Sequence, residues 1–220
     1  MRRIIGSAFL SLDGVMQAPG GPTEDPTGGF AHGGWLAPVA DAEFGAAMGE
    51  FFARPFDLLL GRRTYDIFAA FWSYTTDEDG IAPNFNSCAK YVLTRGRQDL
   101  PWANSYRLAS VEDVAALKAT DGPDLLIRGS SAIYPALLAA GLLDRLTLLT
   151  FPVVLGGGKR LFGDGTPPVT MRAVEGRVTS GGVTIVTFEP AGPVQTVAIA
   201  PPSTSDREAK RQRRMAEGSW

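Results

Sequence analysis

The stretch Leu58-Leu59-Leu60-Gly61-Arg62-Arg63-Thr64-Tyr65 decides the fold. An apolar run that stops at a glycine, followed by two arginines and a threonine, predicts a buried strand, a tight turn and the start of a helix. Open α/β sheets bind their ligands where a strand ends and a helix begins. This turn offers positive charge, a hydroxyl group and free helix N–H groups. The sequence therefore predicts a phosphate-binding turn at residues 61–64.

Two further strand ends repeat the pattern. The strand predicted at 90–93 runs into Thr94-Arg95-Gly96, and the strand predicted at 124–127 runs into Arg128-Gly129-Ser130-Ser131. In a parallel sheet, the carboxyl ends of neighbouring strands lie along one edge. Three arginine-bearing turns favour a ligand with several phosphates, because each charge-assisted hydrogen bond contributes about 1.5–3 kcal/mol. One such turn alone is more typical of a solvated surface.

The rest of the chain alternates strands with helices and closes with a hairpin. Apolar and small residues at 4–12 predict a central first strand that ends at Asp13-Gly14. The other expected elements are a Gly- and Pro-rich loop at 19–35, helices at 40–54, 65–71, 111–119 and 132–140, and strands at 146–155, 170–178 and 183–188. This order predicts an α/β fold with a mostly parallel central sheet and an antiparallel C-terminal hairpin.

Length and composition limit the possible classes of protein. The chain of 220 residues predicts one domain at 1–189 and a poorly ordered basic tail at 190–220. A net charge of −2 argues against nucleic-acid binding. One cysteine and one histidine predict no metal site, and reduced thiols are typical of the cytoplasm, where we expect the protein. No apolar run is long enough to predict a membrane span.

Four motifs resemble the dihydrofolate reductase superfamily: Leu60-Gly61-Arg62-Arg63-Thr64-Tyr65, Leu93-Thr94-Arg95, Ile127-Arg128-Gly129-Ser130-Ser131, and the segment 141–162 with Pro-Val-Val-Leu-Gly at 152–156. The branch that these motifs resemble most is the C-terminal reductase domain of the bifunctional riboflavin-biosynthesis deaminase-reductase. The resemblance covers about residues 2–189. It implies an NADPH-dependent reductase with that superfamily's three-layer α/β fold and a homodimer. Neither a Rossmann fingerprint nor a P-loop is present in the sequence.

The resemblance also assigns the cofactor site. It places NADPH on these residues: Gly61, Arg62, Arg63, Thr64, Thr94, Arg95, Gly129, Ser130 and Ser131. Thr94 and Arg95 match the turn beside the adenosine 2′-phosphate, so the resemblance implies a preference for NADPH over NADH. The family often has a second glycine in the third turn, where this chain has Arg128 and Ser131. That departure bears on how closely the cofactor approaches the backbone.

Three residues are candidates on the substrate side. Asp41 follows a Trp-Leu-Ala-Pro stretch similar to one in dihydrofolate reductases, whose acidic residue supports protonation of the pterin; the alternative role is a helix N-cap. Asp13 either faces the nicotinamide end or only stabilises a turn. Thr150 either hydrogen-bonds a substrate or an acid, or is an ordinary sheet threonine.

The expected function is hydride transfer from NADPH to a small heterocyclic or ribosylamino-pyrimidine substrate, with the glycine-rich loop as a lid. Dihydrofolate reductase or another reductase of the superfamily is one alternative. A module that binds NADPH without turnover is the other.

Overall fold

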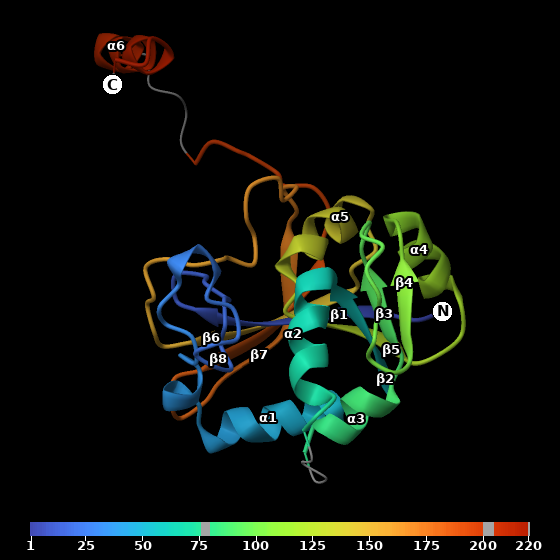
Figure 1. Cartoon of the computed structure of the whole chain (residues 1–220). Coiled ribbons are helices and arrows are strands. Elements are labelled where there is room, and N and C mark those ends of the chain that lie inside the picture. The colour runs from blue at the N-terminus through green and yellow to red at the C-terminus, as the bar shows by residue number, and fades with distance from the viewer. Residues whose placement is uncertain (76–79, 200–204, 220) are drawn as a thin grey trace.

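The computed structural model describes residues 1–75, 80–199 and 205–219. In these residues the strands form one sheet in the order β4-β3-β2-β5-β1-β6-β8-β7 (Figure 1). The strands are β1 (Ile4–Ser11), β2 (Phe56–Gly61), β3 (Lys90–Leu93), β4 (Ser105–Leu108), β5 (Asp124–Arg128), β6 (Arg145–Phe151), β7 (Met171–Val178) and β8 (Thr184–Pro190). The helices are α1 (Ala42–Phe52), α2 (Arg62–Trp72), α3 (Ala82–Ser87), α4 (Val111–Ala119), α5 (Tyr134–Ala139) and α6 (Asp206–Ala216).

The sheet is parallel from β4 to β6 and antiparallel at its far edge. β1 pairs in parallel with β5 and β6, and β2 pairs in parallel with β3 and β5. β8 is antiparallel to both β6 and β7. The hairpin turns at Gly182, whose positive φ of 85° suits glycine. The predicted α/β class, the central first strand and the C-terminal hairpin are confirmed.

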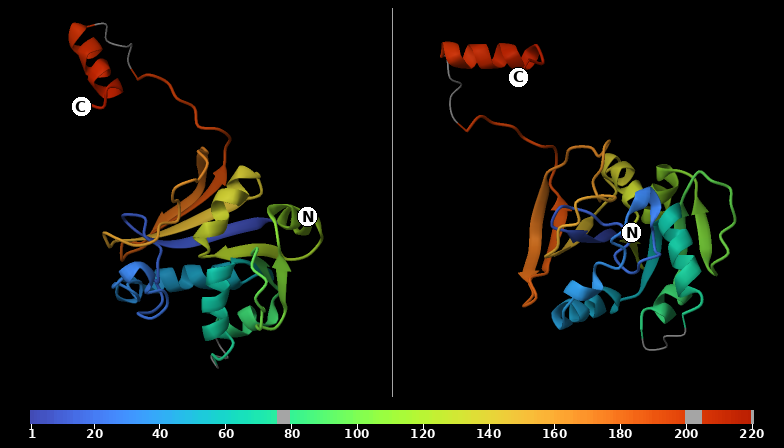
Figure 2. Two further views of the ribbon diagram at one scale, coloured as in Figure 1. Left: turned by 45° about the horizontal axis from the view of Figure 1, so that its top comes forward. Right: turned by 60° about the vertical axis from the view of Figure 1, so that its left-hand side comes forward.

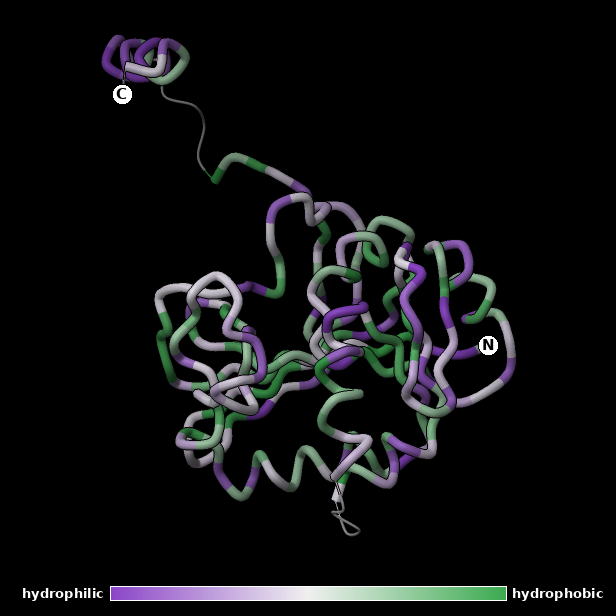
Figure 3. Tube along the Cα trace, in the orientation of Figure 1, coloured by the Kyte–Doolittle hydropathy of each residue, from purple (hydrophilic) through white to green (hydrophobic). Residues whose placement is uncertain are grey.

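Helices cover both faces of the parallel strands and complete three layers (Figure 2). One face packs against α1, α2 and α3 through Phe44, Tyr65 and Phe85. The other packs against α4 and α5 through Val114 and Tyr134. Every residue of β2 is buried, as expected for a strand covered on both faces. Figure 3 shows the apolar residues gathered along these central strands.

The connections change face at β5. β1 and β2 both pair with β5, and the chain leaves them through α1 and α2, which lie on one face of the sheet. It leaves β5 through α5 on the opposite face. In open α/β sheets, ligands bind outside the carboxyl ends of the strands at such a switch point. The topology therefore points to the turn after β5, at Gly129 and Ser130, as the centre of a site.

Several predicted boundaries were wrong. The sequence analysis predicted no helix between residues 71 and 90, where the structure contains α3. The many polar residues there conceal the buried Ala82 and Phe85. β4 was missed because Tyr106 and Arg107 are exposed on this edge strand and leave no apolar signal. β6 ends at Phe151 rather than at 155, since Pro152 follows and cannot donate to the sheet. The helix expected at 132–140 is a 3-10 turn (Ser131–Ile133) followed by α5.

After β8 the chain leaves the domain and reaches α6, which stands apart from it in Figures 1 and 2. The sequence analysis expected a poorly ordered tail and did not predict this helix. The Ser205 hydroxyl accepts a hydrogen bond from the Glu208 N–H and caps its start. Figure 3 shows α6 as largely hydrophilic. The division of the chain at residue 189 stays a prediction. Among the helices of the described residues, none combines the length and apolar character needed to cross a membrane.

Candidate functional site

The turns after β2 and β5 are locked together at the switch point. The Gly61 N–H donates to the Ser130 hydroxyl at 3.0 Å, and the Ser130 N–H donates to the Thr64 hydroxyl at 3.1 Å. Gly129 and Ser130 both have a positive φ, of 65° and 58°. A left-handed serine costs about 1–2 kcal/mol. Backbone strain of this kind, held in place by surrounding hydrogen bonds, is concentrated at ligand-binding sites.

Both glycines of these turns allow close packing. A Cβ atom at Gly61 would lie 3.2 Å from the Ile133 Cγ2 atom, and one at Gly129 would lie 3.5 Å from the Thr64 hydroxyl oxygen. Gly129 also needs glycine because of its positive φ. The backbone at the centre of the edge is therefore closely packed against neighbouring residues of the fold.

The first turn of α2 carries the two arginines of the opening motif. The helix begins at Arg62 and not at 65 as expected, so both arginines lie at its N-terminus. Arg62 donates to the Asp66 carboxylate at 2.9 Å and to the Gln98 carbonyl at 3.1 Å. The hydrogen bond to Asp66 raises the pKa of the Arg62 guanidinium. Arg62 is therefore already engaged within the protein.

Arg63 and Arg95 differ from Arg62. Both are exposed, and neither forms a hydrogen bond or ion pair with any residue that the structure describes. Arg95 sits in a turn that the Thr94 hydroxyl shapes by accepting from the Gly96 N–H at 3.1 Å. Because β3 lies beside β2, the turn with Arg95 follows the strand next to the one that leads to Arg63. The edge thus carries two cations that have no partner within the described residues.

Arg128 corrects the prediction of a third arginine on this edge. Side chains alternate between the faces of a strand, and Arg128 lies on the face covered by α1, opposite to Ile127. Only 8 % of it is exposed, and it donates to the Ser7 hydroxyl at 2.7 Å. The third turn therefore offers Gly129, Ser130 and Ser131 to the edge, without a guanidinium.

Asp41 is the N-cap of α1 and joins it to the β7–β8 hairpin. Its carboxylate accepts from the Phe44 N–H at 2.7 Å and from the Gly181 N–H at 2.9 Å. A hydrogen bond from the Thr179 hydroxyl, together with these backbone groups, lowers the pKa of Asp41. The side chain is therefore a carboxylate near neutral pH.

Asp13 has a similar set of partners at the end of β1. It accepts from the Ser11 hydroxyl at 2.7 Å and from the N–H groups of Leu155 and Gly156 at 3.0 and 2.9 Å. The Ser11 hydroxyl and these backbone groups lower its pKa from 3.8 to about 2. Asp13 therefore fastens the end of β1 to the turn that follows β6.

Thr150 lies within β6, on the face of the sheet that α1 does not cover. It pairs with Leu10 and Thr184 in the sheet. Its neighbours Leu149 and Phe151 pack against α1, so Thr150 lies on the opposite face of the sheet. Its side chain is separated by the sheet from the helix that Asp41 caps.

The glycine-rich loop is held by two residues that the sequence analysis missed. The side-chain amide of Gln17, which is 4 % exposed, donates to the carbonyls of Asp25 and Thr27 and accepts from the Lys159 N–H. The Lys159 ammonium forms an ion pair with Asp25 at 2.5 Å. Neither residue belongs to a periodic pattern, so the sequence gives no signal for these contacts.

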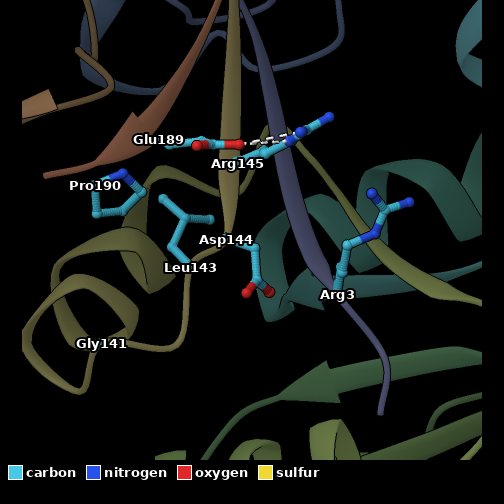
Figure 4. Close-up of a pocket in the computed structure, with 7 residues that line it drawn as sticks. All are labelled: Arg3, Gly141, Leu143, Asp144, Arg145, Glu189 and Pro190. Atoms are coloured by element: carbon cyan, nitrogen blue, oxygen red, sulfur yellow. Dashed lines mark hydrogen bonds and ion pairs between the residues drawn. The ribbon is translucent and has the colours of Figure 1, made fainter. Parts of the chain in front are cut away.

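A separate pocket lies at the amino end of the sheet (Figure 4). It has a volume of about 440 Å³ and is lined by Arg3, Gly141, Leu143, Asp144, Arg145, Glu189 and Pro190. Its arginines are already paired, Arg3 with Asp124 and Arg145 with Glu189. It also lies away from the switch point, so its charges are better explained as part of the fold.

Known proteins resemble this chain over most of its length. The chain is 26 % identical to the uncharacterised protein YyaP of Bacillus subtilis, over 85 % of this chain and 94 % of that protein. A putative riboflavin biosynthesis protein of Shewanella sp. PV-4 shares the fold with a TM-score of 0.62 and 23 % identity, over 86 % of this chain and 99 % of that one.

Two more distant structures share the fold. A pyrimidine reductase-like protein of Corynebacterium diphtheriae has a TM-score of 0.54 at 13 % identity, over 86 % of this chain and 92 % of that one. Dihydrofolate reductase of Enterococcus faecalis, solved in complex with NADP(H) and RAB-propyl, has a TM-score of 0.54 at 16 % identity, over 86 % of this chain and 96 % of that one. The RibD C-terminal domain family matches residues 2–185. This chain therefore belongs to the RibD C-terminal domain family and has the dihydrofolate-reductase-like fold.

Proposed function

We propose that this protein is an NADPH-dependent reductase that transfers a hydride to a small heterocyclic or ribosylamino-pyrimidine substrate. The observation that carries the proposal is a pair of exposed arginines, Arg63 and Arg95, that have no partner within the described residues. They follow β2 and β3 on the same edge of the sheet as the locked turn at Gly129. Exposed cations next to a glycine-rich strand end at a switch point suit a dinucleotide with several phosphates.

The chain's own residues fit that cofactor. The N-terminus of α2 presents free N–H groups at Arg62, Arg63 and Thr64, because Gly61 before it has no side chain to cap them. Gly129, Ser130 and Ser131 bring the backbone close to the pyrophosphate. Thr94 and Arg95 take the adenosine 2′-phosphate, which selects NADPH over NADH. When bound, NADPH supplies the hydride from its nicotinamide ring.

The substrate site lies between β1, α1 and the glycine-rich loop. Asp41 and Asp13 are held as carboxylates, so their role at neutral pH is to orient the substrate or a water that supplies the proton. Thr150 lies on the face of the sheet opposite to α1, so it could contact a substrate only from that face. The glycine-rich loop, fastened through Gln17 and Lys159, excludes water from the reacting atoms.

A titration of the protein with NADPH, followed by cofactor fluorescence, tests this function. We expect saturable binding of NADPH, and binding of NADH weaker by about tenfold or more, because the 2′-phosphate contact to Arg95 is missing. Arg97→Ala, which removes an exposed arginine in the same loop, is the matched control for Arg95→Ala. Absence of NADPH binding, or equal affinity for both cofactors, would contradict the proposal.

Oxidation of NADPH with a panel of substrates distinguishes the alternatives. Turnover of a ribosylamino-pyrimidine favours the riboflavin-pathway type of reaction, to which the family and the name of the Shewanella protein point. Turnover of dihydrofolate favours the dihydrofolate reductase alternative, and turnover of another substrate favours a different reductase of the family. Binding of NADPH without any turnover favours a non-catalytic module.

We also propose that the protein is a cytoplasmic homodimer. β7 forms one edge of the sheet and exposes nearly all its residues, including Val174 and Val178. An unpaired edge with exposed valines is a surface on which a second chain can dock. Sedimentation analysis at several protein concentrations tests the assembly, and Val178→Lys should shift it towards the monomer.

A further inference from the structure

Arg128 is a buried cation with an incomplete set of partners. Its guanidinium has five N–H donors. Within the described residues it uses one on the Ser7 hydroxyl and a weak one on the Met48 sulfur at 3.8 Å, and it forms no ion pair. Burial lowers its pKa to about 10. A buried charge without a counter-charge is costly to folding, so its presence calls for an explanation.

Lys90 shows what a buried structural cation looks like in the same molecule. It is fully buried, and its three N–H donors all reach backbone carbonyls, those of Asn86, Cys88 and Ala103, at 2.8 to 3.1 Å. No donor of Lys90 is left over for a ligand. Arg128 differs from Lys90, because most of its five N–H donors have no acceptor within the described residues.

Apolar side chains surround the guanidinium of Arg128. Its guanidinium lies 5.1, 5.6 and 5.2 Å from the ring centres of Phe9, Phe51 and Phe52. These three rings and Met48 are each only partly buried. They come from β1 and from α1, the elements next to the switch point. A ligand that reaches Arg128 would therefore place an apolar or ring-shaped body against the phenyl rings.

We propose that Arg128 binds a carboxylate on a planar, largely apolar substrate of this enzyme. The assignment rests on the proposed function, because it names the substrate class of the same reductase site. It favours a small heterocyclic substrate that carries a carboxylate over a ribosylamino-pyrimidine, which has none. A planar guanidinium pairs with a carboxylate through two parallel hydrogen bonds. One monovalent cation balances the single charge of a carboxylate, whereas a phosphate monoester carries about two negative charges and needs further cations. Within the described residues, Arg128 is the only cation among these rings.

Calorimetric titration of the full chain with benzoate and with benzamide tests the assignment. The two probes have nearly the same shape, but only benzoate carries a carboxylate. We expect benzoate to bind the native protein about tenfold or more tightly than benzamide, and inorganic phosphate to bind no better than benzamide. Arg128→Met should abolish the preference for benzoate. Arg128→Lys should keep part of it, and Arg54→Met, an exposed arginine just beyond α1, should keep all of it.

Thermal unfolding separates a binding arginine from a structural one. Without ligand, Arg128→Met should melt at the same temperature as the native protein or higher, because it removes a buried charge that lacks a carboxylate partner. Equal affinities for benzoate and benzamide would overturn the assignment, as would a preference that persists in Arg128→Met. Tighter binding of phosphate would overturn the choice of a carboxylate. Arg128→Met should bind NADPH as tightly as the native protein does. If the native protein does not bind NADPH, the proposed reductase function is refuted, and the comparison of benzoate with benzamide still tests Arg128.

Discussion

The two ends of the sheet use their charged residues in opposite ways. At the amino end the arginines are paired with carboxylates: Arg2 with Asp57, Arg3 with Asp124 and Arg145 with Glu189. At the carboxyl end Arg62 pairs with Asp66, but Arg63 and Arg95 have no partner among the described residues. Paired arginines at the amino end stabilise the fold, whereas Arg63 and Arg95 at the carboxyl end are available to bind a ligand.

Two aspartates fasten loops to the sheet. Asp13 and Asp41 accept hydrogen bonds mostly from backbone N–H groups of neighbouring turns. Both carboxylates therefore serve to fasten loops of the fold. An edge built in this way keeps its positive charge while its backbone stays fixed, which suits a phosphate-bearing cofactor.

The largest expected change in the free energy of unfolding comes from the amino end of the sheet. Asp57→Ala leaves the Arg2 guanidinium, which is 3 % exposed, without its carboxylate partner. Removing one member of a buried ion pair costs about 3–5 kcal/mol, so we expect a loss of that size in the free energy of unfolding, measured with urea. Asp121→Ala removes only an exposed partner of the N-terminus and should leave the unfolding midpoint unchanged. A similar midpoint for both variants would show that charge at the amino end does not stabilise the fold.

A smaller effect is expected where the turns of the carboxyl end lock. Ser130→Ala removes the acceptor of the buried Gly61 N–H. An unsatisfied buried donor costs about 1–3 kcal/mol, and NADPH binding should weaken as well, because the turn loses its fixed shape. Ser131→Ala is the matched control for stability, since its hydroxyl has no partner in the described part of the chain. Equal unfolding free energies for the two variants would show that the hydrogen bond from Gly61 to Ser130 does not stabilise the two turns.

The smallest expected change is in the dependence of stability on acid pH, through Asp13. The pKa of Asp13 is about 2 in the folded protein and 3.8 ordinarily, so its stabilising effect is present above about pH 4 and is lost as the pH falls towards 2. The unfolding midpoint should therefore drop over this range. Asp13→Asn should drop less, and its curve should converge with that of the native protein near pH 2. Parallel curves for the two proteins would mean that Asp13 does not fasten the turn after β6.

Local patterns made much of the fold predictable. The buried run before Gly61 indicated a central strand. The helix predicted at 111–119 is α4, where Ser110 and Asp113 form a capping box. β4 could not be predicted, because an exposed edge strand has no apolar alternation to reveal it.

The candidate site was predictable only in part. The three strand ends were recognisable because glycine and arginine follow an apolar run. The position of Arg128 was not, since it depends on which face of β5 the side chain takes and on three phenyl rings from distant segments. The contacts of Gln17 and Lys159 were hidden for a similar reason, because each joins loops that are far apart in the sequence.

Binding and stability measured on the same double variant, Arg63→Ala with Arg95→Ala, test the central claim most directly. We predict that affinity for NADPH falls by about a hundredfold or more, since two charge-assisted hydrogen bonds are lost. The free energy of unfolding should stay within about 0.5 kcal/mol of the native value, because neither arginine has a partner within the described residues. Unchanged NADPH affinity, or a loss of stability as large as that of Asp57→Ala, would contradict the account.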